Sequence, residues 1–318
     1  MKLPTPVGVE AAARALAGHL APTPLVRCEL ISRETGADVF IKNETVSPVA
    51  SFKLRGALTA LLRARGRGEL RRVVTSSTGN HGQGVAYAAR MLGLAADVFM
   101  PEIANPTKRA MIQAFGARIH QAGRDLDAAK ELAIRFAEDH AALFVDDGES
   151  CDVMEGAGSV GLEIARELEP DVVLVPMGSG SLAAGCGVAL KAGRPTTRVI
   201  AVQAKGAPAM VESFRARAPV ERPAETAADG LVCRVPARLA LSALLTAVDD
   251  AMLVSDDALL RAVRLMAEQA HLLVEPAGAA GLAALSERSS ELSGQRVVIV
   301  ATGSNLTPDL LRRAVATV

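Results

Sequence analysis

DVVLVPMGSGSLAAGCGVALKAG (171–193) contains the local pattern that decides the fold. Its apolar run is continuous, which is typical of a strand buried on both faces, and the Gly/Ser turn after it leads into an Ala-rich stretch with helical spacing. VIAVQ (199–203) and RVVIVATG (296–303) contain similar continuous runs. Strands that alternate with helices build a parallel sheet. The sequence therefore predicts an α/β fold, with these three strands at the centre of a mostly parallel sheet flanked by helices.

The first half of the chain repeats the same strand, turn and helix pattern. The predicted strands are ADVFIKNE (37–44), RRVVTSS (71–77) and AADVFMPE (95–102), and the predicted helices are SFKLRGALTALLRARG (51–66), capped by Ser51, GNHGQGVAYAARMLG (79–93) and KRAMIQAFG (108–116). The polar stretch 215–230 interrupts the pattern and predicts a long loop near a cleft. At 318 residues the chain exceeds the usual size of a single core, so we expect two lobes.

The overall composition points to a small-molecule partner. Lys+Arg and Asp+Glu are equal at 35 each, so no net charge favours a nucleic acid or an anionic membrane. The four cysteines form no C-x-x-C pair, which favours reduced thiols and a cytoplasmic location. The first residues lack the apolar core of a signal peptide, and no apolar run is long enough to span a bilayer, so we expect no membrane partner.

Gly178-Ser179-Gly180-Ser181 follows the strand in 171–178, where the start of a helix can bind an anion. Glycines let the backbone approach a phosphate, and the serines add hydroxyl donors. Gly178-x-Gly180-x-x-Ala183 also fits a loose dinucleotide-binding fingerprint, but the next strand ends in Gln203 rather than in the expected acidic residue. The turn is therefore a phosphate site, a dinucleotide site or a structural turn.

Thr75-Ser76-Ser77-Thr78-Gly79-Asn80-His81-Gly82 forms a second strand-to-helix turn. Its hydroxyls, amide and free backbone N–H groups suit a carboxylate. A plain helix cap with two glycines is the alternative, and His81 alone is equally typical of a first helical turn.

Lys53 in Ser51-Phe52-Lys53 is a candidate nucleophile. Most lysines are solvated surface charges. This one falls in the first turn of a predicted helix, where the helix dipole disfavours an ammonium, and Phe52 adds partial desolvation. A lysine that is neutral part of the time can form a Schiff base with an aldehyde and then act as a base.

Several motifs resemble those of one family in the same order along nearly the whole chain. They are FIKNE, SFKLRGA, SSTGNHGQGVAYAA, MPEIANPTK, FGA, EGAGSVGLEI, VPMGSGSL, GAPAM, ADGL, EPAGAAGLAAL and ATGSN. Together they resemble the fold-type II pyridoxal-phosphate (PLP) enzymes, in the threonine/serine dehydratase and serine racemase branch. The resemblance implies a two-lobed fold like that of the tryptophan synthase β subunit. It places a large PLP-binding domain at 1–66 and 148–318 and a small substrate-binding domain at 67–147.

The resemblance also implies roles for particular residues. Lys53 would hold PLP and remove the Cα proton, and Thr78 would be a second catalytic residue. The implied cofactor-binding residues are Phe52, Lys53, Asn80, Gly178, Ser179, Gly180, Ser181, Leu182, Glu275 and Thr302. The implied carboxylate-binding residues are Ser77, Thr78, Gly79, Asn80 and His81.

The implied activity is that of a dehydratase, or ammonia-lyase, which converts an L-β-hydroxy amino acid to a 2-oxo acid and ammonia. Threonine and serine are the expected substrate type, with 3-phenylserine or a hydroxyectoine-derived compound as bulkier options. A β-replacement synthase, an amino-acid racemase and a silent PLP- or amino-acid-binding protein are the alternatives. We expect a homodimer.

The sequence departs from the family pattern at three places. Gln203 and Ala209 stand where metal-stimulated racemases carry acidic residues, so we expect no metal site. Thr78 replaces the serine that acts as the second base in racemases, and its extra methyl group favours dehydration over racemisation.

Overall fold

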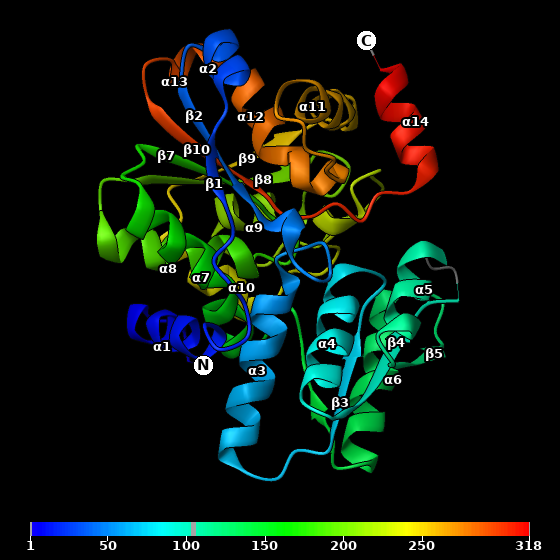
Figure 1. The fold of residues 1–318 in the computed structure, drawn as a ribbon. Helices are drawn as coiled ribbons and strands as arrows, with labels where there is room; N and C mark the ends of the chain where they lie inside the picture. Colours follow the sequence, from blue (N-terminus) through cyan, green and yellow to red (C-terminus); the bar gives the residue numbers. More distant parts are fainter. Residues whose placement is uncertain (1, 103–105, 318) are drawn as a thin grey trace.

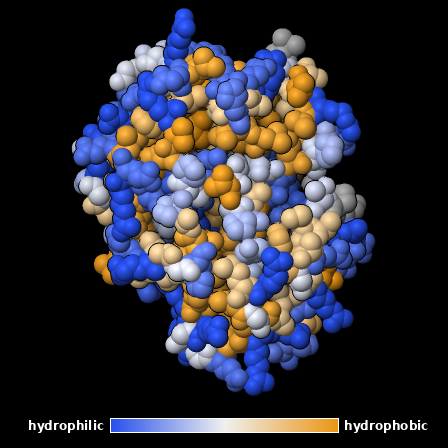
Figure 2. All heavy atoms as spheres, in the orientation of Figure 1, coloured by the Kyte–Doolittle hydropathy of each residue, from blue (hydrophilic) through white to orange (hydrophobic). Residues whose placement is uncertain are grey.

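The computed structural model describes residues 2–102 and 106–317, which form two sheets, each covered by helices (Figure 1). Residues 103–105 of the MPEIANPTK motif lie outside the described residues. Figure 2 shows the same face with hydrophilic residues around the periphery and hydrophobic residues gathered across its upper part.

The larger sheet has six strands in the order β1-β2-β10-β7-β8-β9. β1 pairs antiparallel with β2, and the other neighbours are parallel. The strands are β1 (Leu25–Arg27), β2 (Asp38–Asn43), β7 (Val172–Pro176), β8 (Arg198–Ala204), β9 (Asp250–Val254) and β10 (Arg296–Ala301). β10, β7 and β8 hold the inner positions, which confirms the three strands predicted for the centre.

Both faces of this sheet are buried, which explains the continuous apolar runs. Val172 and Leu174 of β7 pack on one side, while Val173 and Val175 pack on the other. The helices on the first side are α11 (Asp256–Gln269) and α12 (Ala280–Glu287). The helices on the second side are α7 (Cys151–Glu167), α8 (Ser181–Gly193) and α10 (Arg238–Ala247).

The smaller sheet has four parallel strands in the order β5-β4-β3-β6. They are β3 (Arg72–Ser76), β4 (Ala95–Met100), β5 (Arg118–Gln121) and β6 (Leu143–Phe144), all within the range 67–147. One core contains buried residues of α3 (Lys53–Arg67), α4 (Asn80–Met91) and α5 (Pro106–Ala114). α6 (Leu126–Asp139) supplies buried residues to a second core, on the opposite face of this sheet.

The remaining elements connect and flank these layers. They are α1 (Pro6–Leu16), α2 (Glu29–Thr35), α9 (Ala209–Ala216), α13 (Ser289–Leu292), α14 (Pro308–Ala316) and the short 3-10 helices η1 (Glu44–Val46), η2 (Asp229–Leu231) and η3 (Pro276–Ala279). The predicted loop runs from the end of α9 to η2. Across 2–102 and 106–317, the helices are too short or too polar to cross a bilayer.

The predicted helix cap at Ser51 is wrong. Phe52 occupies the N-cap position of α3 and makes no side-chain capping bond. Ser51 instead forms a β-bridge with Gly303, so its backbone is still extended two residues before the helix begins. Lys53 is therefore the first residue of α3.

Candidate active site

A cavity of about 370 Å³ between the two sheets brings the predicted site residues together. Its lining includes Phe52, Lys53, Ser77, Thr78, Gly79, Asn80, His81, Gly178, Ser179, Gly180, Ser181, Leu182, Glu275 and Thr302. These residues come from segments that are far apart in the sequence. Their convergence follows from the topology, because parallel strands place their carboxyl ends, and the turns that follow them, at one edge of a sheet.

Lys53 is held in the cavity by the backbone on one side and by an ion pair on the other. Phe52 N–H donates to the Thr302 carbonyl at 3.0 Å, which ties the start of α3 to the end of β10. The Lys53 Nζ atom lies 4.9 Å from the centre of the Phe52 ring. It also lies 2.5 Å from Asp147 Oδ2. The sequence alone did not predict this ion pair.

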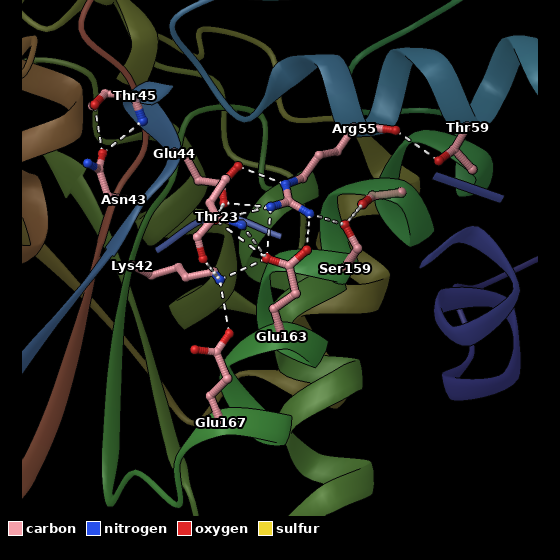
Figure 3. Close-up of polar contacts among 11 residues, drawn as sticks. Thr23, Lys42, Asn43, Glu44, Thr45, Arg55, Thr59, Ser159, Glu163 and Glu167 are labelled. Atoms are coloured by element: carbon pink, nitrogen blue, oxygen red, sulfur yellow. Dashed lines mark hydrogen bonds and ion pairs between the residues drawn. The ribbon is translucent and has the colours of Figure 1, made fainter. Parts of the chain in front are cut away.

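A buried ion-pair network anchors α3 two residues beyond Lys53 (Figure 3). Arg55 donates to both oxygens of Glu44, at 2.7 and 2.9 Å, and to both oxygens of Glu163, at 2.6 and 2.9 Å. Lys42 Nζ lies 2.8 Å from Glu163 Oε2. Together these contacts join β2, η1 and α7 to the first turn of α3, so they fix the position of the helix that carries Lys53.

The turn from Gly178 to Ser181 has the shape of an anion cup. Gly180 has φ +98° at the N-cap of α8, a conformation that favours glycine. A Cβ atom on Gly178 would lie 2.6 Å from the Gly230 carbonyl oxygen, so no side chain fits there. The first N–H groups of a helix have no partner within the helix, so they can bind an anion. The turn leads directly into α8, a helix of 13 residues.

The turn after β3 contains the predicted carboxylate-binding residues. The Ser77 hydroxyl accepts from Gly79 N–H at 3.1 Å, and α4 begins at Asn80. Thr78 lines the cavity. His81 is buried, and its Nε2 lies 3.2 Å from the Val145 carbonyl oxygen. The arrangement places the amino end of α4, with its free N–H groups, against the cavity.

Asn80 is engaged with Glu275 in a buried polar cluster. Asn80 Nδ2 donates to Glu275 Oε1 at 2.5 Å, and Lys108 Nζ donates to Glu275 Oε2 at 3.2 Å. Lys108 also donates to Asp229 at 2.7 Å. Burial raises the pKa of Glu275, whose side chain is 2% exposed. Burial also disfavours the charge on Lys108, but Glu275 and Asp229 outweigh it and raise the pKa of that lysine.

Asp147 is the main cavity residue that the sequence analysis missed. Its Oδ2 accepts from Ser179 Oγ at 2.9 Å as well as from Lys53, and Ser181 Oγ donates to its backbone carbonyl. Burial opposes its charge, but the Lys53 ammonium and the other neighbours lower its pKa to about 2. Asp147 comes just after the short strand β6, so the strand-end rule that found the other turns could have found it.

Gln203 has a structural role in this chain. Its Oε1 accepts from Val211 N–H at 3.1 Å, and its Nε2 donates to the Leu231 carbonyl at 3.4 Å. Ala209, the first residue of α9, is buried. These neutral residues therefore serve packing and backbone hydrogen bonding at the places where metal-stimulated racemases are expected to carry acids.

The cavity fits the parts of pyridoxal phosphate. In the cup from Gly178 to Ser181, the first position has no room for a Cβ atom, so only backbone can approach a phosphate there. The cup also leads into the first turn of α8, whose free N–H groups can bind the phosphate. Lys53 offers a primary amine in the same cavity, and Phe52 offers an aromatic face beside it.

Comparisons with known proteins agree with this fit. The family model of the pyridoxal-phosphate dependent enzymes matches residues 16–303. The L-threonine ammonia-lyase of Thermotoga maritima is 34% identical over 309 residues, which are 96% of this chain and 77% of that protein. A catabolic L-threonine dehydratase of Staphylococcus aureus is 32% identical over 96% of this chain and 89% of its own length.

Solved structures show the same relationship. A threonine deaminase of known crystal structure has a TM-score of 0.89 and 33% identity, with 96% of this chain and 99% of that chain covered. Maize serine racemase has a TM-score of 0.92 and 28% identity, with 99% and 97% covered. The two-lobed fold and the cofactor implied by the sequence motifs are thereby confirmed, and the chain belongs to the fold-type II branch of the pyridoxal-phosphate dependent enzymes.

Proposed function

We propose that this chain is a PLP-dependent ammonia-lyase that converts an L-β-hydroxy amino acid of the threonine/serine type to a 2-oxo acid and ammonia. The observation that carries the proposal is that Lys53, the anion cup at Gly178 to Ser181 and the turn from Ser77 to His81 line one cavity. Relatives named L-threonine ammonia-lyase and L-threonine dehydratase, which align over 96% of the chain, support it.

Different residues of the chain would bind the cofactor, bind the substrate carboxylate and transfer the proton. The N–H groups at Gly178 to Leu182 would hold the cofactor phosphate, and Lys53 would anchor its aldehyde. Ser77 to His81 would bind the substrate carboxylate through the start of α4. PLP, when bound, supplies the electron sink that makes the Cα proton acidic. The Lys53 amine would accept that proton.

Thr302, Phe52, Asn80 and Glu275 would orient the cofactor. Thr302 is buried, lines the cavity and has a neutral hydroxyl. A neutral partner does not hold a proton on a pyridine nitrogen as an acid would, so elimination of the β-substituent competes well with other fates of the substrate. Thr78 lines the same cavity and stays a predicted second catalytic residue.

The test is 2-oxo acid release from purified protein given threonine, serine, 3-hydroxyaspartate or 3-phenylserine. We expect ammonia and a 2-oxo acid in equal amounts from at least one of them. Lys53→Ala should abolish both this activity and the covalent cofactor adduct seen by mass spectrometry after borohydride reduction. Lys205→Ala, at an exposed lysine, is the matched control and should keep both. A reduced adduct that persists in Lys53→Ala would refute the assignment.

The same assay separates the alternatives. A β-replacement synthase would release little oxo acid until a nucleophile is added, and a racemase would give the D-enantiomer as its main product. A silent binding protein would keep the adduct at Lys53 but give no product from any substrate.

We also propose a homodimer in the cytoplasm, with a small substrate-binding domain at 67–147 inserted into a large domain formed by 1–66 and 148–318. The free cysteines at 28, 151, 186 and 233 support a reducing compartment. Exposed apolar residues such as Val26 and Leu30 support association with a second copy. Light scattering of the purified protein tests the dimer.

A further inference from the structure

The active-site cavity has a buried inner wall and an exposed outer rim. Ser181, Thr302 and Glu275 line the cavity and are buried. Leu126 and Val235 also line it, yet they are 39% and 44% exposed. A residue that lines a cavity and also faces solvent lies where the cavity opens. These two apolar side chains therefore mark the mouth of the cavity.

An ion pair crosses this mouth. Arg234 Nη2 contacts Asp127 Oδ2, and both residues line the cavity. Their side chains are 48% and 41% exposed, so the pair lies at the rim and not in the interior. Asp127 follows Leu126 in the first turn of α6, and Arg234 precedes Val235. The two charges therefore lie beside the two apolar side chains that mark the mouth.

The two charged residues belong to different lobes (Figure 1). Asp127 is part of α6, which packs on the smaller sheet. Arg234 lies four residues before the start of α10, which packs on the larger sheet. Any movement that widens the mouth between these two segments must therefore break the pair, and any movement that narrows it again can restore the pair.

Arg234 is carried by an irregular segment, residues 232–237, which connects η2 to α10 and is called the strap below. Just before the strap, Asp229 accepts from Lys108 Nζ at 2.7 Å. Just after it, Glu149 accepts from the backbone N–H of the first residue of α10 at 2.5 Å. Both ends of the strap are therefore tied to other segments of the chain.

The middle of the strap is held by weaker contacts. The Arg234 carbonyl accepts from Arg222 N–H at 3.2 Å, and the Arg234 side chain forms the exposed pair with Asp127. Exposed ion pairs contribute little to stability, because water and salt screen them. A contact of this kind can open each time a ligand passes, whereas a buried pair would resist opening.

We propose that the strap and the start of α6 form a gate at the mouth of the cavity, with the Arg234–Asp127 ion pair as its latch. While the pair is formed the mouth is narrow, and larger molecules reach Lys53 and the cofactor slowly. When the pair opens, they enter more rapidly. The gate acts on access alone, so the proposal holds for whichever amino acid the enzyme converts.

The test uses the PLP-loaded enzyme and two reagents that release the cofactor from Lys53. Hydroxylamine is small, and O-benzylhydroxylamine carries the same reactive amine on a bulky ring. Loss of the absorption of the Lys53-bound cofactor gives a rate constant for each reagent. The ratio of the rate constant of the bulky reagent to that of the small one reports access through the mouth, because a ratio cancels any change in cofactor reactivity that both reagents share.

Arg234→Gln and Asp127→Asn each remove one charge of the latch. We expect each variant to raise the ratio about two- to fivefold, the range that the loss of an exposed ion pair allows. Combining Asp127→Arg with Arg234→Asp restores a pair of opposite charges and should return the ratio toward the wild-type value. Arg198→Gln is the matched control and should keep the ratio. Arg198 forms a similarly exposed pair with Glu291, and neither is among the described residues that line the cavity.

Salt gives an independent check of the latch. At 1 M ionic strength the screening length is only about 3 Å, so the wild-type ratio should rise toward that of Arg234→Gln, while the ratio of the variant changes little. The proposal is overturned if both single variants keep the wild-type ratio, or if Arg198→Gln raises it equally. It is also overturned if the charge exchange gives no recovery, or if wild type and Arg234→Gln respond to salt alike.

Discussion

Arg55→Met breaks the buried network that positions α3, and its cost can be worked out from the contacts. Glu44 is fully buried and loses the two hydrogen bonds from Arg55, at 2.7 and 2.9 Å, and keeps only the Thr23 hydroxyl. Glu163 still pairs with Lys42 at 2.8 Å. The variant therefore leaves one buried carboxylate without a cation, which costs about 3–5 kcal/mol of the free energy of unfolding.

Urea unfolding at a fixed PLP concentration measures this change, because bound cofactor adds its own stability. Replacing both partners, in Glu44→Gln with Arg55→Met, removes the uncompensated charge and should recover at least about 1.5 kcal/mol of the loss. The control is Arg312→Met at the exposed pair with Asp309, which should change little. The reasoning is refuted if Arg55→Met costs no more than the control, or if the double variant is less stable than the single one.

Two further predictions concern the cavity. Gly178→Ala should weaken PLP binding by about tenfold or more in a titration, because its Cβ would lie 2.6 Å from the Gly230 carbonyl oxygen, whereas Gly66→Ala, with open space around it, should bind PLP as the wild type does. Asp147 has a folded-state pKa of about 2, below its ordinary 3.8, so its charge stabilises the fold above pH 3.8 and this contribution is lost as the pH falls to about 2. Acid unfolding should show that wild type and Asp147→Asn differ most above that range and converge below it; parallel curves would contradict the assigned pKa.

Local patterns were enough to predict the central strands and the turns that follow them. In β7 and β10, continuous apolar runs end directly in Gly/Ser/Thr turns, so the sequence carries both the strand and the site residues in one short segment. The same is true of β3 and the turn at Ser77 to His81. The cofactor could then be inferred because separate motifs matched one family in order.

Other features depend on contacts between distant segments. Asp147 follows a strand of only two residues. The short apolar run 141–145 comes before it, but Asp-Asp-Gly is also a typical turn sequence, so the segment did not stand out as a strand end with a functional residue. Glu163 lies far along the chain from Arg55 and Glu44, and sequence alone would assign all three to the surface, where most charged residues lie. Their burial follows only from the packing of α3 against η1 and α7, which local patterns do not encode.

Polar contacts join the segments of the two sheets beside the cavity. Lys108, from the helix between β4 and β5, binds Asp229 at the end of the long loop, and Asn80 at the start of α4 binds Glu275 before η3. Each contact joins a residue of the smaller sheet's segment to one of the larger sheet's segment. The turn that we propose to bind the carboxylate belongs to the smaller sheet, and the proposed anion cup belongs to the larger one. The same contacts would therefore set the distance between the substrate and the cofactor. Lys53 and Asp147 form an ion pair at the same cavity, so these interactions also position the amine that we propose as the base.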